Sequence, residues 1–292
     1  MQTRPFGTTG LSVPVLGLGT AQVGSPDVPE ANAARLLNRA LDEGLTLIDT
    51  AHCYGISEER IGRHLAGRRD EYVLSSKCGH QLEGYDDWTP AIVRASVELS
   101  LQRMRTDHID VLHLHSCDKE DLLDGSLAAT MQELKDEGKI GVVAYSGDNA
   151  ALAHAVSSGR FAAVEASVSI ADQWNLHHVL GEAAASGLGV IAKRPIANGI
   201  WRHAERPTGV YGDVYWDRLQ DLAYATDLDL AEFALRFTAF APGVTTAIMG
   251  TTNPDNITRA VATVAQGPLP DDALAHVAER WDAVGQDWDS RR

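Results

Sequence analysis

Short apolar runs alternate with helical patterns along almost the whole chain, and this rhythm is the strongest constraint on the fold. Strands are expected at residues 15–20, 46–51, 72–77, 109–115, 140–147, 162–169, 189–195 and 245–251. Strands this apolar are typical of a parallel sheet covered by helices on its outer surface. Eight strand–helix units suit closure into a (β/α)₈ barrel of about 250 residues.

The helical segments have recognisable ends. Helices are expected at or near residues 30–44, 57–65, 89–103, 126–137, 149–157, 177–185, 230–240, 254–264 and 271–283. Gly44 suits the position after a helix C-terminus. Thr89 followed by Pro90 suits an N-cap and a first helical residue.

An open, doubly wound sheet is the alternative architecture. If it bound a dinucleotide, it would normally show a glycine fingerprint after its first strand. The stretch "GLGTAQVG" (17–24) lacks the GxGxxG spacing, and no helix opens directly on it. No linker or composition shift marks a second domain. We therefore predict one (β/α)₈ barrel domain over residues 1–292, with an N-terminal β-hairpin and a C-terminal helix.

Composition narrows the possible partners. The chain has 25 basic and 40 acidic residues, a net charge of −15, which disfavours nucleic acid. No apolar run approaches the roughly 20 residues that span a bilayer, and the first residues lack a signal-peptide core. Neither CxxC nor HExxH occurs, so no disulfide framework or metal site is expected. We expect a cytoplasmic protein, monomeric by default, that binds a small molecule and neither nucleic acid nor membrane.

The ends of the second, third and fourth strands carry ionisable groups. Asp49 ends the second strand with Tyr54 close behind, Lys77 ends the third, and His115 ends the fourth. His113 lies two residues earlier and therefore on the same face. In a barrel these strand ends share one mouth, which is where active sites lie.

This set of groups has a chemical logic. A phenol is a weak acid, with an ordinary pKa of about 10, and a nearby ammonium such as Lys77 lowers it. The carboxylate of Asp49 would keep Lys77 charged and in place, and a histidine can orient a carbonyl oxygen. Tyr54 could then donate a proton to a carbonyl that receives a hydride. Since no side chain supplies hydride, a nicotinamide cofactor is implied.

Two segments are candidates for the substrate wall. Residues 196–213 form a long irregular stretch that contains Trp201 and Tyr211, and such stretches inside barrels are often functional. Residues 79–88, which end at Trp88, are a second candidate. A variable surface loop is the alternative interpretation of the first segment.

The three cysteines, Cys53, Cys78 and Cys117, each follow or precede one of these ionisable residues in sequence. They could form a redox-sensing cluster. Inert reduced thiols at strand ends are the preferred interpretation.

With these residues in this order, the sequence resembles the aldo-keto reductases. The stretch "LIDTAHCYGISEERIG" (47–62) is similar to the family's second-strand signature, and "SSK" supplies Lys77. In "IDVLHLH", counting five residues from Asp110 selects His115 as the catalytic histidine. The resemblance implies catalytic roles for Asp49, Tyr54, Lys77 and His115. It also implies an extended NAD(P)(H) across the barrel mouth, without a Rossmann domain.

At the cofactor site, several positions differ from the residues that are usual in the family. Glu165 stands where glutamine is usual, Lys193 where a tyrosine often stacks, and Gly250 and Asn256 where basic residues often hold the 2′-phosphate. Arg259 could compensate, so NADP(H) is favoured slightly over NAD(H). The residues that the resemblance assigns to the cofactor are Ser146, Glu165, Lys193, Arg194, Pro195, Gly250, Thr251, Thr252, Asn256 and Arg259.

The sequence therefore predicts an oxidoreductase that interconverts an aldehyde or ketone and the corresponding alcohol. Two alternatives stay open. One is an NAD-dependent sugar or polyol dehydrogenase that works toward oxidation. The other is a cofactor-binding, redox-sensing regulatory subunit.

Overall fold

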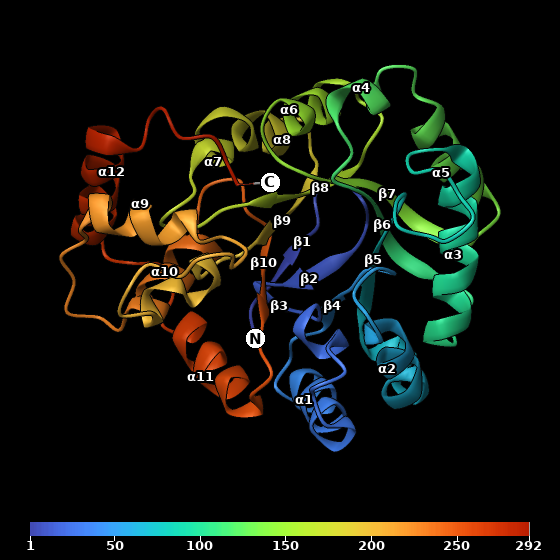
Figure 1. Cartoon of the computed structure of the whole chain (residues 1–292), viewed down its shortest axis with the longest axis horizontal. Helices are drawn as coiled ribbons and strands as arrows, with labels where there is room; N and C mark the ends of the chain where they lie inside the picture. Colours follow the sequence, from blue (N-terminus) through green and yellow to red (C-terminus); the bar gives the residue numbers. More distant parts are fainter. Residues whose placement is uncertain (292) are drawn as a thin grey trace.

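The computed structural model of the chain, which describes residues 1–291, is built around a closed barrel of parallel strands (Figure 1). Pairing of the last strand with the first closes it, with Met249 opposite Leu18. The predicted barrel is confirmed, and the open doubly wound sheet is wrong. The strands are β3 (Leu16–Gly19), β4 (Leu47–Asp49), β5 (Val73–Cys78), β6 (Ile109–His115), β7 (Ile140–Ser146), β8 (Ala163–Ser167), β9 (Gly189–Lys193) and β10 (Thr246–Gly250).

Helices surround the barrel (Figure 1). They are α1 (Glu30–Asp42), α2 (Ser57–His64), α3 (Pro90–Met104), α4 (Lys119–Leu122), α5 (Ser126–Asp136), α6 (Asn149–Ser157), α7 (Trp174–His178), α8 (Leu180–Ala185), α9 (Val214–Leu222), α10 (Leu230–Ala239), α11 (Pro254–Ala265) and α12 (Asp271–Val284). The predicted caps are confirmed: the Thr89 hydroxyl accepts from the amide of Ile92, and Gly44 adopts a φ of +87° after α1. None of the described helices is long and apolar enough to cross a membrane.

Several helical details differ from the sequence prediction, and α4 is one that was not predicted. The helix expected over residues 177–185 is two shorter ones, because Val179, with φ −130°, interrupts the helical backbone between α7 and α8. The irregular stretch 196–213 begins with a 3₁₀ helix, η3 (Ala197–Arg202). Helix α9, which follows that stretch, was not predicted. It buries Tyr215 and Leu219 on one face.

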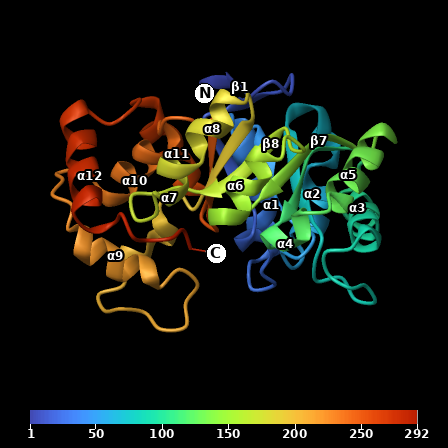
Figure 2. The ribbon, with the colours of Figure 1, turned by 90° about the horizontal axis from the view of Figure 1, so that it is seen from above.

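The N-terminal hairpin closes one end of the barrel. Strands β1 (Thr3–Pro5) and β2 (Ser12–Pro14) pair antiparallel, and Phe6 beside them is fully buried. A side chain at Gly189 would meet the Phe6 ring, since an added Cβ would lie 2.6 Å from it. Phe6 packs in one apolar cluster with barrel residues such as Leu47 and Ile191. Figure 2 shows the hairpin at one end of the molecule and α9 with the loop before it at the other.

Candidate active site

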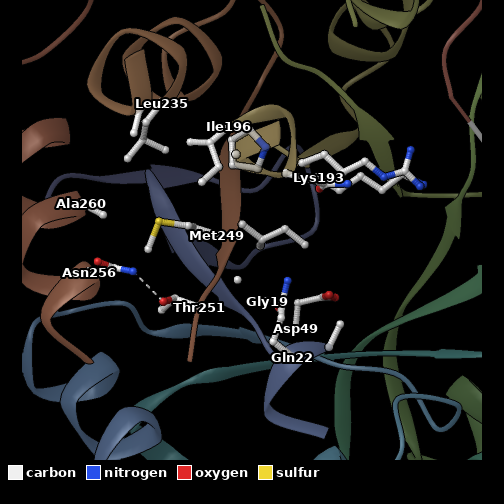
Figure 3. A pocket seen from close by; sticks show the side chains of 18 of the residues that line it. Gly19, Gln22, Asp49, Lys193, Ile196, Leu235, Met249, Thr251, Asn256 and Ala260 are labelled. Carbon is white, nitrogen blue, oxygen red and sulfur yellow. Dashed lines mark hydrogen bonds between the residues drawn. The ribbon is translucent and has the colours of Figure 1, made fainter. Parts of the chain in front are cut away.

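A cavity of about 1490 Å³ opens at the carboxyl ends of the strands. Pockets for small ligands commonly measure about 300–1,000 Å³, so this one has room for an extended ligand together with a second molecule. Figure 3 shows side chains from several strands and from α10 and α11 pointing into it. Residues from the ends of the strands that line it include Gly19, Asp49, His115, Ser146, Glu165, Lys193 and Gly250.

A buried ion pair lies at the base of this cavity. The Lys77 ammonium donates to Asp49 Oδ2 at 2.5 Å and to the carbonyl oxygen of Thr50 at 3.0 Å. Ser75 donates to the other Asp49 oxygen at 2.7 Å. Because β4 and β5 are adjacent and pair in register, with Asp49 opposite Ser75, the two charged side chains meet inside the barrel. Burial opposes the charge on Lys77, but the carboxylates of Asp49 and Glu165 hold its pKa above the usual value.

Tyr54 lies beside this pair. The Lys77 nitrogen is 5.2 Å from the centre of the Tyr54 ring. Burial raises the pKa of Tyr54 and outweighs the charge of Lys77, which acts to lower it as the sequence predicted, so the predicted lowering of the pKa is wrong. The net direction is upward in the protein without ligands, so the phenol is protonated at neutral pH. Tyr54 therefore has the proton that a general acid needs.

A second carboxylate shares the same ammonium. Glu165 Oε2 on β8 lies 3.4 Å from the Lys77 nitrogen. Burial and the charge of Glu165 raise the pKa of Asp49 to about 7, although Lys77 and Ser75 act in the other direction. Burial also opposes the charge of Glu165, yet Lys77 keeps the pKa of Glu165 below its usual value. Two carboxylates on one ammonium therefore take up a proton more readily than isolated ones.

His113 is buried next to these groups. Burial lowers the pKa of His113 to about 4, so its ring is neutral. The structure places His113 in the barrel interior and His115 at the cavity, so His115 is the one of the two that a ligand there can reach.

His115 faces the cavity next to Tyr54. The two rings are 5.7 Å apart between centroids and meet edge to face at 81°. His115 Nδ1 lies 2.9 Å from Nε2 of His80 and 3.5 Å from the Cys53 sulfur. This leaves Nε2 as the nitrogen available to a ligand. Burial and the charge of Lys77 hold the pKa of His115 well below its usual value, so the ring is neutral.

All ten residues assigned to the cofactor by resemblance line this cavity. The Ser146 hydroxyl is buried and has no hydrogen-bond partner within residues 1–291. Buried polar groups are rarely left unpaired, so this hydroxyl suits a ligand amide. Lys193 pairs with Asp148 at 3.2 Å, and Asn256 donates to the Thr251 hydroxyl at 3.0 Å (Figure 3). These features fit an extended nicotinamide dinucleotide.

Two of the three predicted substrate residues line the cavity. Trp201 on η3 and Tyr211 beyond it both contribute to the wall, and the Arg194 guanidinium lies 4.8 Å over the Tyr211 ring. Trp88 is not among the residues that line it. Its ring covers Gly79, where an added Cβ would be 2.8 Å away, and packs 5.1 Å from the His80 ring. Trp88 thus supports His80 rather than the cavity wall.

The sequence interpretation missed several neighbours of the site. His80 contacts His115. Gln22 lines the cavity beside Gly250, and a side chain at position 250 would clash with the Gln22 side chain. Asp229 and Glu232 also line the cavity. No local pattern marks these residues, since only the packing of separate loops brings them to the strand ends.

A known protein family matches most of the chain. The model of the aldo/keto reductase family matches residues 15–282. The chain belongs to the aldo/keto reductase family. It is therefore an oxidoreductase of a family that uses NAD(P)(H), as its resemblance predicted.

Individual relatives differ in how much of the chain they match. The structure of aldo-keto reductase AKR11C1 from Bacillus halodurans, in a holo form, superposes with a TM-score of 0.85 at 28% identity and covers 96% of both chains. D-threo-aldose 1-dehydrogenase from a Pseudomonas species is 28% identical over 92% of this chain and 94% of its own length. L-galactose dehydrogenase from Arabidopsis thaliana is 32% identical, but the match spans about half of each protein, 50% of this chain and 49% of that one.

Proposed function

We propose that this oxidoreductase reduces an aldehyde or ketone to the corresponding alcohol with Tyr54 as the proton donor. One observation carries the proposal. The fully buried Lys77–Asp49 pair lies against Tyr54, and the Tyr54 phenol and the His115 ring face the same cavity. A buried ion pair is expensive to desolvate and is weak evidence for a stabilising role. Its place beneath a phenol at a ligand cavity favours a catalytic one.

Each residue then has a defined task. When bound, a nicotinamide would supply the hydride. Tyr54 gives its proton to the oxygen of the carbonyl as negative charge develops there. The Lys77 ammonium stabilises the phenolate that remains, and Asp49 holds Lys77 in place. Neutral His115 donates a hydrogen bond from Nε2 to the same oxygen and orients it.

The cofactor is proposed to be NADP(H) in preference to NAD(H). Arg259, in the middle of α11, lines the cavity and supplies a guanidinium that can pair with a phosphate group. The acidic side chains of Asp229 and Glu232, which also line the cavity, oppose phosphate binding little because both already have partners. Asp229 accepts from the amides of Ala231 and Glu232, and Glu232 pairs with Arg236 at 3.0 Å.

The second candidate function is oxidation of a sugar or polyol by the same residues in reverse, with the Tyr54 phenolate as the base. The match to D-threo-aldose 1-dehydrogenase along almost the whole chain favours it. Because a general acid in one direction is the general base in the other, the two candidates share one site and differ in substrate and preferred direction.

A panel of aldehydes, ketones, sugars and polyols, run with NADPH, NADH and their oxidised forms, tests the proposal. We expect turnover of carbonyls with NADPH, and a large loss in Tyr54→Phe but not in Tyr85→Phe, a matched change at an exposed tyrosine. Turnover confined to sugars and oxidised cofactor would favour the second candidate. Cofactor binding without turnover of any compound would contradict both and favour a redox-sensing subunit.

A further inference from the structure

Three metal-ligating side chains converge at the edge of the site, and the proposed reaction uses only one of them. They are Cys53 after β4, His80 after β5 and His115 at the end of β6. Their donor atoms all lie within 4.8 Å of one another, and all three residues are partly accessible. We propose that they form a binding site for a divalent transition metal ion, with Zn²⁺ as the occupant.

The distances between donor atoms fit one ion. His80 Nε2 and His115 Nδ1 are 2.9 Å apart, and the Cys53 sulfur lies 3.5 Å from His115 Nδ1 and 4.0 Å from His80 Nε2. Tetrahedral zinc bonds of about 2.3 Å to sulfur and about 2.0 Å to nitrogen place ligand atoms roughly 3.3–3.5 Å apart. Shifts of about 0.5 Å would therefore bring all three donors onto one ion.

The scaffold holds these donors in place. Trp88 packs against the His80 ring, and His52 Nε2 lies 2.5 Å from the carbonyl oxygen of His80. The other ring nitrogen of His52 contacts the carbonyl oxygen of Lys77 on β5. The loop that carries His80 is thus tied to the barrel, which lowers the entropy lost when a metal binds.

The charged groups beside the cluster are paired with one another. Lys77 is nearby, but the carboxylates of Asp49 and Glu165 both pair with it, so these three groups together carry one negative charge when ionised. Lys193 is paired with Asp148. Asp49, His113 and Glu165 form a second set of potential ligands. The Lys77 ammonium already lies within 3.4 Å of both carboxylates, which argues against a metal there.

Metal binding releases one proton, that of the Cys53 thiol. Zn²⁺ forms bonds to the thiolate of Cys53, to Nε2 of His80 and to Nδ1 of His115, and the thiol proton leaves to solvent. The two histidines bind as neutral rings whose other nitrogens carry the proton. Three protein ligands leave a fourth position for water or another small ligand, as in zinc sites that remain open.

Metal binding is best tested on the full chain, prepared without a polyhistidine tag. Titration with Co²⁺ should give a thiolate-to-cobalt charge-transfer band and visible bands of tetrahedral intensity, and Zn²⁺ should displace it at one ion per chain. In Cys53→Ser the thiolate band should vanish and the Kd for Zn²⁺ should rise by at least ~100-fold, beyond the ~10- to 100-fold typical of losing a supporting partner. His80→Gln should weaken Zn²⁺ binding to a similar extent.

Cys78→Ala is the matched control, since Cys78 is buried and lies outside the cluster. It should keep both the band and the affinity. Absence of a thiolate band in the wild type, or a band that persists in Cys53→Ser, would overturn the proposal. So would equal Zn²⁺ affinity in the wild type and His80→Gln. Because the readout is binding, it is independent of whether Tyr54 is the catalytic acid.

Discussion

Replacement of Glu165 by glutamine isolates the effect of the second carboxylate on the buried Lys77–Asp49 pair. In the wild type, burial and Glu165 raise the pKa of Asp49 from its ordinary value of 3.8 to about 7. Glutamine keeps nearly the same shape but carries no charge. The Lys77 ammonium then serves Asp49 alone, so the pKa of Asp49 should fall.

The contribution of Asp49 to the free energy of unfolding follows from the difference between its pKa in the folded and in the unfolded chain. A carboxyl group whose pKa is higher in the folded protein stabilises the fold fully below its unfolded pKa, and this contribution is lost as the pH rises through the folded pKa. For Asp49 the window is from about 3.8 to about 7. At about 1.4 kcal/mol for each pKa unit, the loss over this window is on the order of 4 kcal/mol.

Urea unfolding at a series of pH values between 4 and 8 measures this contribution. The free energy of unfolding of the wild type should fall more steeply with rising pH than that of Glu165→Gln. Glu182→Gln, a change at an exposed position, should follow the wild type. If the wild type and Glu165→Gln show the same pH dependence, Glu165 does not perturb Asp49 and the coupling argued from the structure is wrong.

Three further outcomes are expected. Trp201→Ala should change the relative kcat/KM of substrates of different size, and equal losses for every substrate would argue against a role in selectivity. Arg259→Ala should weaken NADPH binding about tenfold more than NADH binding, a difference of about 1.4 kcal/mol in a fluorescence titration; an equal loss for both would remove Arg259 as the phosphate ligand. Phe6→Ala should lower the free energy of unfolding by about 3–5 kcal/mol because it opens a cavity beneath the hairpin, and a change below about 1 kcal/mol would mean that the hairpin does not seal the barrel.

The barrel itself could be predicted because its strands are strongly apolar and its helices have local end signals. The predicted run 109–115 agrees with β6 as observed, and the other strands differ by a few residues at their ends. Helix α9 was missed although Tyr215, Leu219 and Leu222 have helical spacing. The long polar and aromatic stretch before it, and Arg218 within it, weakened that pattern.

The site was predictable only in part. Asp49, Lys77 and His115 end successive strands, so the barrel alone brings them to one mouth. His80 could not be placed from sequence, because its contact with His115 depends on how the 79–88 loop folds back over the strands. The same fold-back directs Trp88 onto Gly79 and His80. The interaction of Glu165 with Lys77 arises across the barrel interior, between strands far apart in the sequence.

The central claim is that Tyr54 donates the proton and that Lys77 acts through it. Its most direct test is kcat for carbonyl reduction in Tyr54→Phe, Lys77→Met and the double variant, with cofactor affinity as the folding control. Tyr54→Phe should lower kcat by about 10² to 10⁴ and leave cofactor bound. The double variant should be little worse than the poorer single one, because residues that act as a unit are not additive. Near wild-type turnover in Tyr54→Phe with cofactor bound, or single defects that multiply in the double variant, would contradict the claim.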